Sequence, residues 1–208
     1  LYGVWKKSLK GIDCETRIDP YNNIVTKLMD KDSTKKSVML SSHSDEIALG
    51  VNYINENGFI FVDEIGGWDL AVILGQQVTI LGYKGKHIPG VISSVPIHVI
   101  ESNEKLPEFG DIYVDIGATC KSEVTKLVAI GDPVIIDRPF VRLRNNRITG
   151  RGLDNRIGVF ALLETARAIA DYDLKYLTNF VASSQEETTM QGALTVPNQL
   201  KPDLAVNL

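Results

Sequence analysis

Three short stretches of the sequence carry histidine and carboxylate side chains, which bind divalent metal ions through nitrogen and oxygen. They are residues 42–46 (SHSDE), residues 152–156 (GLDNR) and residues 185–187 (QEE). In an extended segment His43 and Asp45 point the same way, because residues two apart share a face of a strand. A carboxylate beside a metal-binding histidine commonly fixes the tautomer of the ring. The first stretch is therefore typical of a metal ligand with its orienting partner.

Each stretch taken alone also has a simpler explanation. His43 could be a solvated histidine in a turn. Asp154 could be a helix N-cap, whose side-chain oxygen accepts a hydrogen bond from an amide of the first turn. Adjacent carboxylates such as Glu186 and Glu187 usually lie in a solvated loop. Here they follow an apolar strand, and open α/β sheets place their ligand sites at the carboxyl ends of strands.

Taken together, the three stretches predict one metal centre. We expect His43, Asp154 and Glu187 to lie at the carboxyl ends of strands in one sheet and to converge on one cleft, with Glu186 beside them. Oxygen and nitrogen ligands without cysteine suit zinc, cobalt or manganese. A histidine, a bridging aspartate and a glutamate next to a second glutamate make up much of a two-metal hydrolase site.

The segments that must position these residues differ along the chain. Residues 37–41 form a short apolar run, residues 47–53 alternate at period two, and Asn57-Gly58 then gives a strong hairpin signal. From about residue 66 to residue 146, short β-rich runs are separated by Gly, Pro and Asn turns. This pattern predicts a small all-β barrel or sandwich inserted into another domain.

After Thr149, helical and strand patterns alternate, which predicts an α/β layer with a locally parallel sheet. The apolar positions of the first helix include Ile157 and Phe160, and Gly158 is small enough to let that helix lie close to a sheet. The expected elements are a helix over 154–171, a strand over 177–183, a short helix over 190–200 and a strand over 203–208.

Composition narrows the class of protein. The chain has 208 residues, 44% of them hydrophobic and 23% charged, as in a soluble globular protein. Its net charge of -4 gives no reason to expect a nucleic acid or an anionic membrane as partner. There is no apolar run of membrane-spanning length and no signal-peptide pattern at Leu1. Cys14 and Cys120 stand apart, as free thiols do in a reducing compartment, so we expect a cytoplasmic location.

The motifs, in their order along the chain, resemble those of the M42 aminopeptidase family. Residues 42–47 (SHSDEI) resemble A-H-x-D-E-I-G, and residues 185–187 (QEE), followed by Gly192-Ala193, resemble Q-E-E…G-A. The other three matches are residues 66–69 (GGWD) to G-G-W-D, residues 115–118 (DIGA) to an inserted-domain signature, and residues 153–156 (LDNR) to L-D-[DN]-R.

The resemblance implies a metal-dependent aminopeptidase with a catalytic α/β domain from residues 1–66 and 148–208. An inserted small all-β dimerisation domain would occupy residues 67–147. The partners would be peptide substrates and further copies of the chain, assembled from dimers into a dodecamer. The cofactors would be two divalent ions, zinc or cobalt.

The resemblance also implies a role for each site residue. His43 would bind one ion and Glu187 the other, with Asp154 bridging them. Asp45 would orient His43, and Glu186 would act as the general base toward the attacking water. A further aspartate ligand and a late histidine ligand of the family belong beyond Leu208, so we expect the 208-residue chain by itself to be weakly active or inactive.

Three rival interpretations remain. A catalytically silent subunit of the same fold is the main alternative. Two-zinc peptidases of the M20 or M28 type lack the GGWD and DIGA motifs. A glycoside hydrolase would use Glu186 and Glu187 as its carboxylate pair, but neighbours along a strand project to opposite faces.

Overall fold

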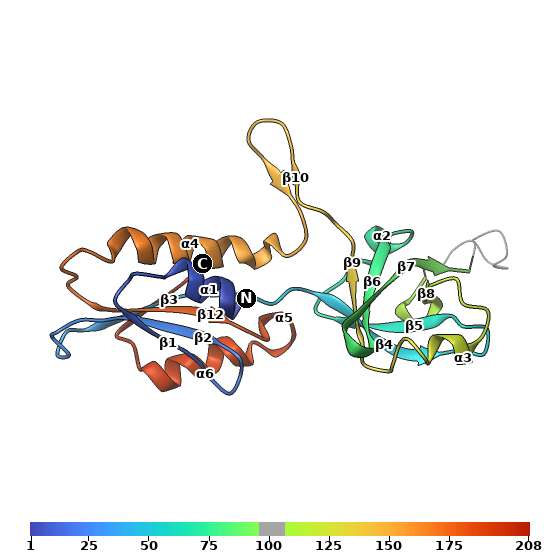
Figure 1. The fold of residues 1–208 in the computed structure, drawn as a ribbon, viewed down its shortest axis with the longest axis horizontal. Helices are drawn as coiled ribbons and strands as arrows, with labels where there is room; N and C mark the ends of the chain where they lie inside the picture. Colours follow the sequence, from blue (N-terminus) through green and yellow to red (C-terminus); the bar gives the residue numbers. More distant parts are fainter. Residues whose placement is uncertain (96–106) are drawn as a thin grey trace. The chain divides into compact units, whose positions relative to one another are not determined.

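The computed structural model describes residues 1–95 and 107–208, and the chain divides into two compact units (Figure 1). Leu1–Glu46 and Gly152–Leu208 form one of them, which we call the α/β unit. Ile47–Arg151 forms the other, which we call the barrel unit. Part of the domain expected over residues 67–147, namely residues 96–106, lies outside the described residues.

The barrel unit begins earlier than the sequence predicted. The expected boundary lay at residue 67, whereas the observed unit starts at Ile47. The reason is that β4 (Ala48–Ile54) and β5 (Ile60–Ile65) pair with each other and with other strands of the barrel. The sequence assigned these two strands to the α/β unit because they follow directly on the motif at residues 42–46.

The α/β unit is built on a mixed five-stranded sheet with the order β1-β2-β12-β3-β13. Strand β3 lies between β12 and β13 and runs parallel to both, which confirms the predicted α/β class with a locally parallel sheet. β2 runs antiparallel to both β12 and β1, and the sequence did not predict β1 or β2. The strands are β1 (Cys14–Ile18), β2 (Ile24–Leu28), β3 (Ser37–His43), β12 (Leu177–Ser183) and β13 (Leu204–Asn207).

Helices cover both faces of this sheet (Figure 1). One face carries α1 (Tyr2–Ser8) and α4 (Leu153–Ile169), whose buried side chains share one apolar cluster with the sheet. The other face carries α6 (Gln191–Leu200), which buries Val196 against a smaller apolar cluster. Because both faces are covered, the carboxyl ends of the central strands are left as the place for polar chemistry.

Helix α4 packs on the sheet through one face, which includes small residues. Its buried positions include Gly158, Leu162 and Ala166, which are spaced at four residues and therefore share one face. The apolar pattern in the sequence also included Ile157 and Phe160, but their side chains are 48% and 61% exposed. Gly158 confirms the expected close approach, because a Cβ there would collide with Ser42 Oγ in β3.

We predict that Gly158→Ala destabilises the protein by about 1–3 kcal/mol, the usual effect of overpacking a core. Alanine normally stabilises a helix by about 1 kcal/mol relative to glycine, so steric conflict must outweigh that gain. Gly3→Ala in α1 is the matched control, because no atom lies within 4 Å of the added Cβ. Urea denaturation followed by circular dichroism measures both variants. Equal stability of the two would contradict the close approach of α4.

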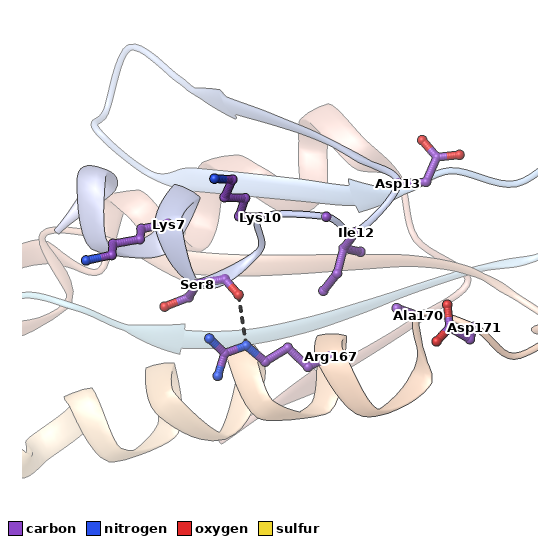
Figure 2. Close-up of a pocket in the computed structure, with 9 residues that line it drawn as sticks. Lys7, Ser8, Lys10, Ile12, Asp13, Arg167, Ala170 and Asp171 are labelled. Carbon is purple, nitrogen blue, oxygen red and sulfur yellow. Dashed lines mark hydrogen bonds between the residues drawn. The ribbon is translucent and has the colours of Figure 1, made fainter.

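A charged contact joins the ends of α1 and α4 (Figure 2). Arg167 Nε donates to the Ser8 carbonyl oxygen at 2.8 Å, and Arg167 Nη1 pairs with Glu164 Oε1 at 2.6 Å. A polar pocket beside this contact includes Lys7 and Asp171 in its lining. The pocket shares no lining residue with the site that the sequence predicts.

The barrel unit is a closed barrel with the strand order β4-β5-β8-β7-β6-β9, which selects a barrel over a sandwich. Its core is apolar, with Leu49, Ile60 and Ile80 fully buried. The predicted hairpin at Asn57-Gly58 is confirmed, since β4 and β5 pair antiparallel around it. The remaining barrel strands are β6 (Gln77–Gly82), β7 (Lys86–Ser94), β8 (Ile112–Asp115) and β9 (Pro133–Ile136).

Short elements complete the barrel unit. A two-stranded sheet of β10 (Val141–Arg142) and β11 (Ile148–Thr149) lies outside the barrel pairing. The short helices are α2 (Leu70–Ile73), η1 (Tyr83–Gly85), η3 (Phe109–Asp111) and α3 (Lys121–Val124). Among the described residues of the whole chain, no helix combines the length and apolar character that crossing a membrane requires.

Candidate metal centre

His43 is the last residue of β3, and the neighbouring strand β12 ends at the same level. Ser183, the last residue of β12, is the register partner of His43. The pairing continues one residue further, because Ser44 N donates to the Ser183 carbonyl oxygen at 2.8 Å. The His43 side chain is only 10% exposed. A buried imidazole is thus fixed at the carboxyl edge of the sheet, where the sequence predicted it.

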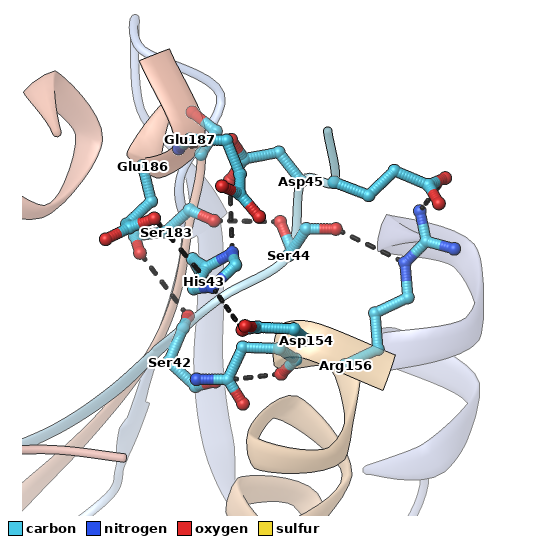
Figure 3. Close-up of polar contacts among 12 residues, drawn as sticks. Ser42, His43, Ser44, Asp45, Asp154, Arg156, Ser183, Glu186 and Glu187 are labelled. Carbon is cyan, nitrogen blue, oxygen red and sulfur yellow. Dashed lines mark hydrogen bonds and ion pairs between the residues drawn. The ribbon is translucent and has the colours of Figure 1, made fainter. Parts of the chain in front are cut away.

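Glu186 and Glu187 begin α5 (Glu186–Thr189), a single helical turn just after β12. Gln185 adopts a left-handed backbone with φ of 59°, which redirects the chain into this turn. One ligand atom from each of His43, Glu186 and Glu187 lies within 4.8 Å of the other two. The two glutamates therefore reach the histidine together (Figure 3).

The position of the glutamates corrects one step of the sequence argument. A glycoside hydrolase is disfavoured if the two glutamates are neighbours on a strand, because such neighbours project to opposite faces. Glu186 and Glu187 lie on a helical turn, so that reason does not apply. The geometry of the two carboxylates leaves this rival open.

Asp154 also contacts His43, but by a route that the sequence did not predict. Its Oδ1 lies 3.0 Å from His43 Nε2, and its side chain is 88% exposed. The expectation that it follows a strand of the same sheet was wrong, because the preceding strand β11 pairs with β10 in a separate sheet. Asp154 instead approaches from the start of α4, and it is not part of the group of three that lies within 4.8 Å.

Asn155 acts as the helix N-cap, the role that one interpretation of the sequence gave to Asp154. The backbone at Asp154 and Asn155 is non-helical, so the regular turns of α4 begin after them. Asn155 Oδ1 accepts a hydrogen bond from Gly158 N at 3.0 Å, as an N-cap side chain does. Ser42 Oγ donates to the Asn155 carbonyl oxygen at 3.0 Å. The Asp154 carboxylate is thereby left to face His43.

Arg156 is a second residue of this region to which the sequence argument gave no role. Its Nη2 lies 3.0 Å from Glu46 Oε1, and its Nε donates to the Ser44 carbonyl oxygen at 3.3 Å. These contacts tie the start of α4 to the segment that follows His43 (Figure 3). One feature of the sequence could have pointed to this pair: Glu46 and Arg156 both lie inside motifs, at residues 42–47 and 153–156, although neither was assigned a chemical role.

Asp45 lies on the opposite side of the imidazole from Asp154. Its Oδ1 is 3.7 Å from His43 Nδ1, beyond hydrogen-bond distance, and its Oδ2 accepts from Glu187 N at 3.2 Å. Neither His43 Nδ1 nor Asp45 Oδ1 has a hydrogen-bond partner, although both atoms are buried. A small approach would join them, which would fix the tautomer that leaves Nε2 facing the other carboxylates.

The electrostatics of the cluster suit a cation. Burial raises the pKa of Glu187 above its ordinary value, and the carboxylates of Glu186, Asp154 and Asp45 raise that pKa further, while His43 opposes them. A bound divalent cation would relieve this repulsion. The donors are one imidazole nitrogen and carboxylate oxygens, the set that zinc and similar ions accept. The residues present therefore fit a divalent metal ion.

Known proteins match both the sequence and the fold. A lysyl aminopeptidase of Pyrococcus furiosus is 30% identical over 203 residues, covering 95% of this chain and 57% of its own length. A glutamyl aminopeptidase of Lactococcus lactis is 30% identical over 172 residues, covering 80% of this chain and 48% of its own length. The solved TET1 peptidase of Pyrococcus horikoshii, described as assembling into a tetrahedron or an octahedral shell, is 27% identical with a TM-score of 0.88.

These matches cover most of this chain but only part of each relative. The P. horikoshii match covers 100% of this chain and 62% of the solved chain. This chain spans about half the length of the curated relatives it matches. The family described as M42 glutamyl aminopeptidase matches residues 22–208, which include all five of the predicted site residues. The chain therefore belongs to the M42 peptidase family.

Proposed function

We propose that this protein is a metal-dependent aminopeptidase, which hydrolyses N-terminal residues from peptides. The observation that carries the proposal is the buried His43, grouped with Glu186 and Glu187 at the ends of β3 and β12 in a member of the M42 family. Its similar relatives are named for lysyl and glutamyl substrates, which have opposite charges. The names of these relatives therefore do not indicate which N-terminal residue this protein prefers.

Each residue of the cluster has a proposed task. His43 Nε2 and a Glu187 oxygen would each hold one of two divalent ions, zinc or cobalt, and Asp154 would serve both ions. Bound ions lower the pKa of water, polarise the scissile carbonyl and stabilise negative charge on its oxygen. Asp45 holds the His43 ring from the Nδ1 side. Glu186, with a side chain that is 31% exposed, takes the proton of the attacking water and passes it to the leaving amine.

We predict that the intact protein, supplied with zinc or cobalt, releases the first residue of short peptides with a free amino terminus. The same peptides with an acetylated amino terminus should remain uncut, and a chelator should abolish release until metal is restored. Chromatography of the products measures both effects. Cleavage of the acetylated peptides at the same rate would contradict an aminopeptidase, and release of sugar from oligosaccharides instead would favour the glycoside hydrolase.

A catalytically silent subunit of the same fold is the second candidate. The observation that favours it is that, among the described residues, the cluster offers one imidazole and a few carboxylates for two ions. Stable metal binding by the intact protein without release of any residue from a panel of peptides would favour this candidate.

We further propose a cytoplasmic homo-oligomer, a dodecamer built from dimers through the barrel unit. The P. horikoshii relative supports assembly. The barrel unit also exposes several large apolar side chains, among them Tyr53, Tyr83 and Ile130. We predict that the intact protein sediments as a multimer of dimers at micromolar concentration. Sedimentation as a monomer would contradict this assembly.

A further inference from the structure

A second buried polar cluster lies where the segment before β2 meets the turn after β12. Asn23 is fully buried and Asp19 is 5% exposed. Asn23 Nδ2 donates to Asp19 Oδ2 at 2.8 Å and to the Gly192 carbonyl oxygen at 3.1 Å. Asn23 Oδ1 accepts from Ser184 N at 2.9 Å. The side-chain amide of Asn23 thus forms hydrogen bonds with the backbone at Ser184 and at Gly192, which are eight residues apart in the chain.

Asp19 holds Asn23 in place. Its Oδ1 accepts from the backbone amides of Tyr21 and Asn23, both at 2.9 Å, and its Oδ2 also accepts from Gln199 Nε2 at 3.0 Å. Burial raises the pKa of Asp19, but these hydrogen bonds outweigh burial, so the pKa lies below its ordinary value. Asp19 is therefore a charged acceptor that connects Asn23 to α6.

The segment between the two bonded points carries Glu186 and Glu187. It begins near Ser184, whose Oγ donates to the Tyr21 carbonyl oxygen, and it ends at Gly192. Its two ends lie close together, because a Cβ at Gly192 would collide with the Ser184 carbonyl oxygen. We call residues 184–192 the carboxylate turn.

The carboxylate turn needs outside support. Gln185 and Met190, on either side of α5, have left-handed backbones with φ of 59° and 57°. Residues other than glycine adopt this backbone conformation at a cost in conformational energy. The conformation therefore persists where surrounding contacts hold it. The described contacts of Asn23 reach the turn just before Gln185 and just after Met190, which are the places where such support would act.

We propose that Asn23 is a positioning residue for Glu186 and Glu187, which acts by holding both ends of the carboxylate turn. Among the described residues, Asn23 forms no hydrogen bond with either glutamate, and it acts on them through Ser184 and Gly192. The consequence for metal binding rests on the proposed function, whereas the consequence for the mobility of the turn does not. Loss of the Asn23 amide should loosen the turn and weaken metal binding without removing a ligand.

The test compares Asn23→Ala, Asp19→Asn and Thr26→Val in the intact protein. Thr26 is the matched control, because it is also fully buried beside the same sheet and forms side-chain hydrogen bonds, in its case with Trp5 Nε1 and Thr16 Oγ1. Asp19→Asn keeps the size of the side chain and removes its charge, so it remains informative if Asn23→Ala does not fold. Two quantities are measured, namely amide hydrogen exchange along residues 184–192 and the dissociation constant for zinc or cobalt alone.

We expect Asn23→Ala to speed exchange in the carboxylate turn at least tenfold and to weaken metal binding about 10- to 100-fold, the range typical of a lost supporting contact. Asp19→Asn should show the same two effects more weakly. Thr26→Val should change neither beyond its effect on global stability. Unchanged exchange and affinity in Asn23→Ala and Asp19→Asn, or an equal loss of affinity in Thr26→Val, would overturn the proposal.

Failure of the positioning role and failure of the proposed function give different results. If the wild-type protein releases no amino-terminal residues and Asn23→Ala still loosens the turn and weakens metal binding, the aminopeptidase proposal fails and the positioning role stands. If the wild-type protein is an active aminopeptidase and Asn23→Ala keeps both the exchange rates and the metal affinity, the positioning role fails alone.

Discussion

Replacing Glu186 by glutamine is expected to lower kcat for peptide hydrolysis by roughly 10²- to 10⁴-fold, the usual contribution of a general base. Metal affinity should stay within a few-fold of wild type, because a base acts on the proton and does not hold the ion. Glutamine keeps the size of the side chain and cannot accept the proton. Steady-state kinetics and a metal titration on the same preparation measure the two quantities.

The geometry makes this test necessary. Glu186 Oε2 lies 3.9 Å from His43 Nε2, and Glu186 belongs to the same close group as Glu187. Position alone would also allow Glu186 to be a ligand. Glu15→Gln, at an exposed position of β1, is the matched control and should change neither quantity. Loss of metal together with activity in Glu186→Gln would assign Glu186 as a ligand and contradict its role as the base.

Replacing Asp154 by alanine is expected to weaken metal binding by more than about 100-fold and to remove measurable turnover. Loss of an outer contact typically costs about 10- to 100-fold in affinity, and a bridging ligand serves both ions. The 3.0 Å contact between Asp154 Oδ1 and His43 Nε2 places the carboxylate beside the imidazole. Equilibrium dialysis followed by metal analysis measures the loss.

The control for Asp154 is Asp171→Ala, which removes an exposed aspartate in the turn that follows α4. That variant should bind metal and turn over peptide as the wild type does. Full metal content in Asp154→Ala would contradict the bridging role. If Glu186→Gln also loses metal, the roles of Glu186 and Asp154 are exchanged.

Within the predicted convergence of His43, Asp154 and Glu187, with Glu186 beside them, the part that joins His43 to the two glutamates has a sound physical reason. Residues 37–41 and 177–183 are apolar runs, as expected of central strands in a covered sheet. Both runs became neighbouring parallel strands, β3 and β12, so the residues that follow them share one edge. The α/β class and a small all-β unit, either a barrel or a sandwich, were predicted from the same kind of pattern.

Other features could not be predicted because their signals are not local. The strands β10 and β11 have two residues each, too few for a pattern, so the separate sheet before Asp154 was missed. Asp19 and Asn23 have the composition of an ordinary turn. Their burial depends on Ser184, which is 161 residues further along the chain than Asn23.

The boundary of the barrel unit was missed for a related reason. β4 begins at Ala48, two residues after the motif that ends at Glu46, and no linker composition separates them. A sequence pattern can locate a strand, but it does not say with which sheet the strand pairs. The pairing of this hairpin with the other barrel strands, β4 with β9 and β5 with β8, was therefore found only in the structure.

The central claim is that His43 and Glu187 each bind one of two divalent ions at the carboxyl ends of β3 and β12. Crystallographic data from the intact protein with zinc, collected at the zinc absorption edge, test it most directly. We predict two anomalous peaks, one about 2.0–2.2 Å from His43 Nε2 and the other at about the same distance from a Glu187 carboxylate oxygen. An ordered site without any peak there, with the His43 ring paired only to Asp154, would contradict the claim.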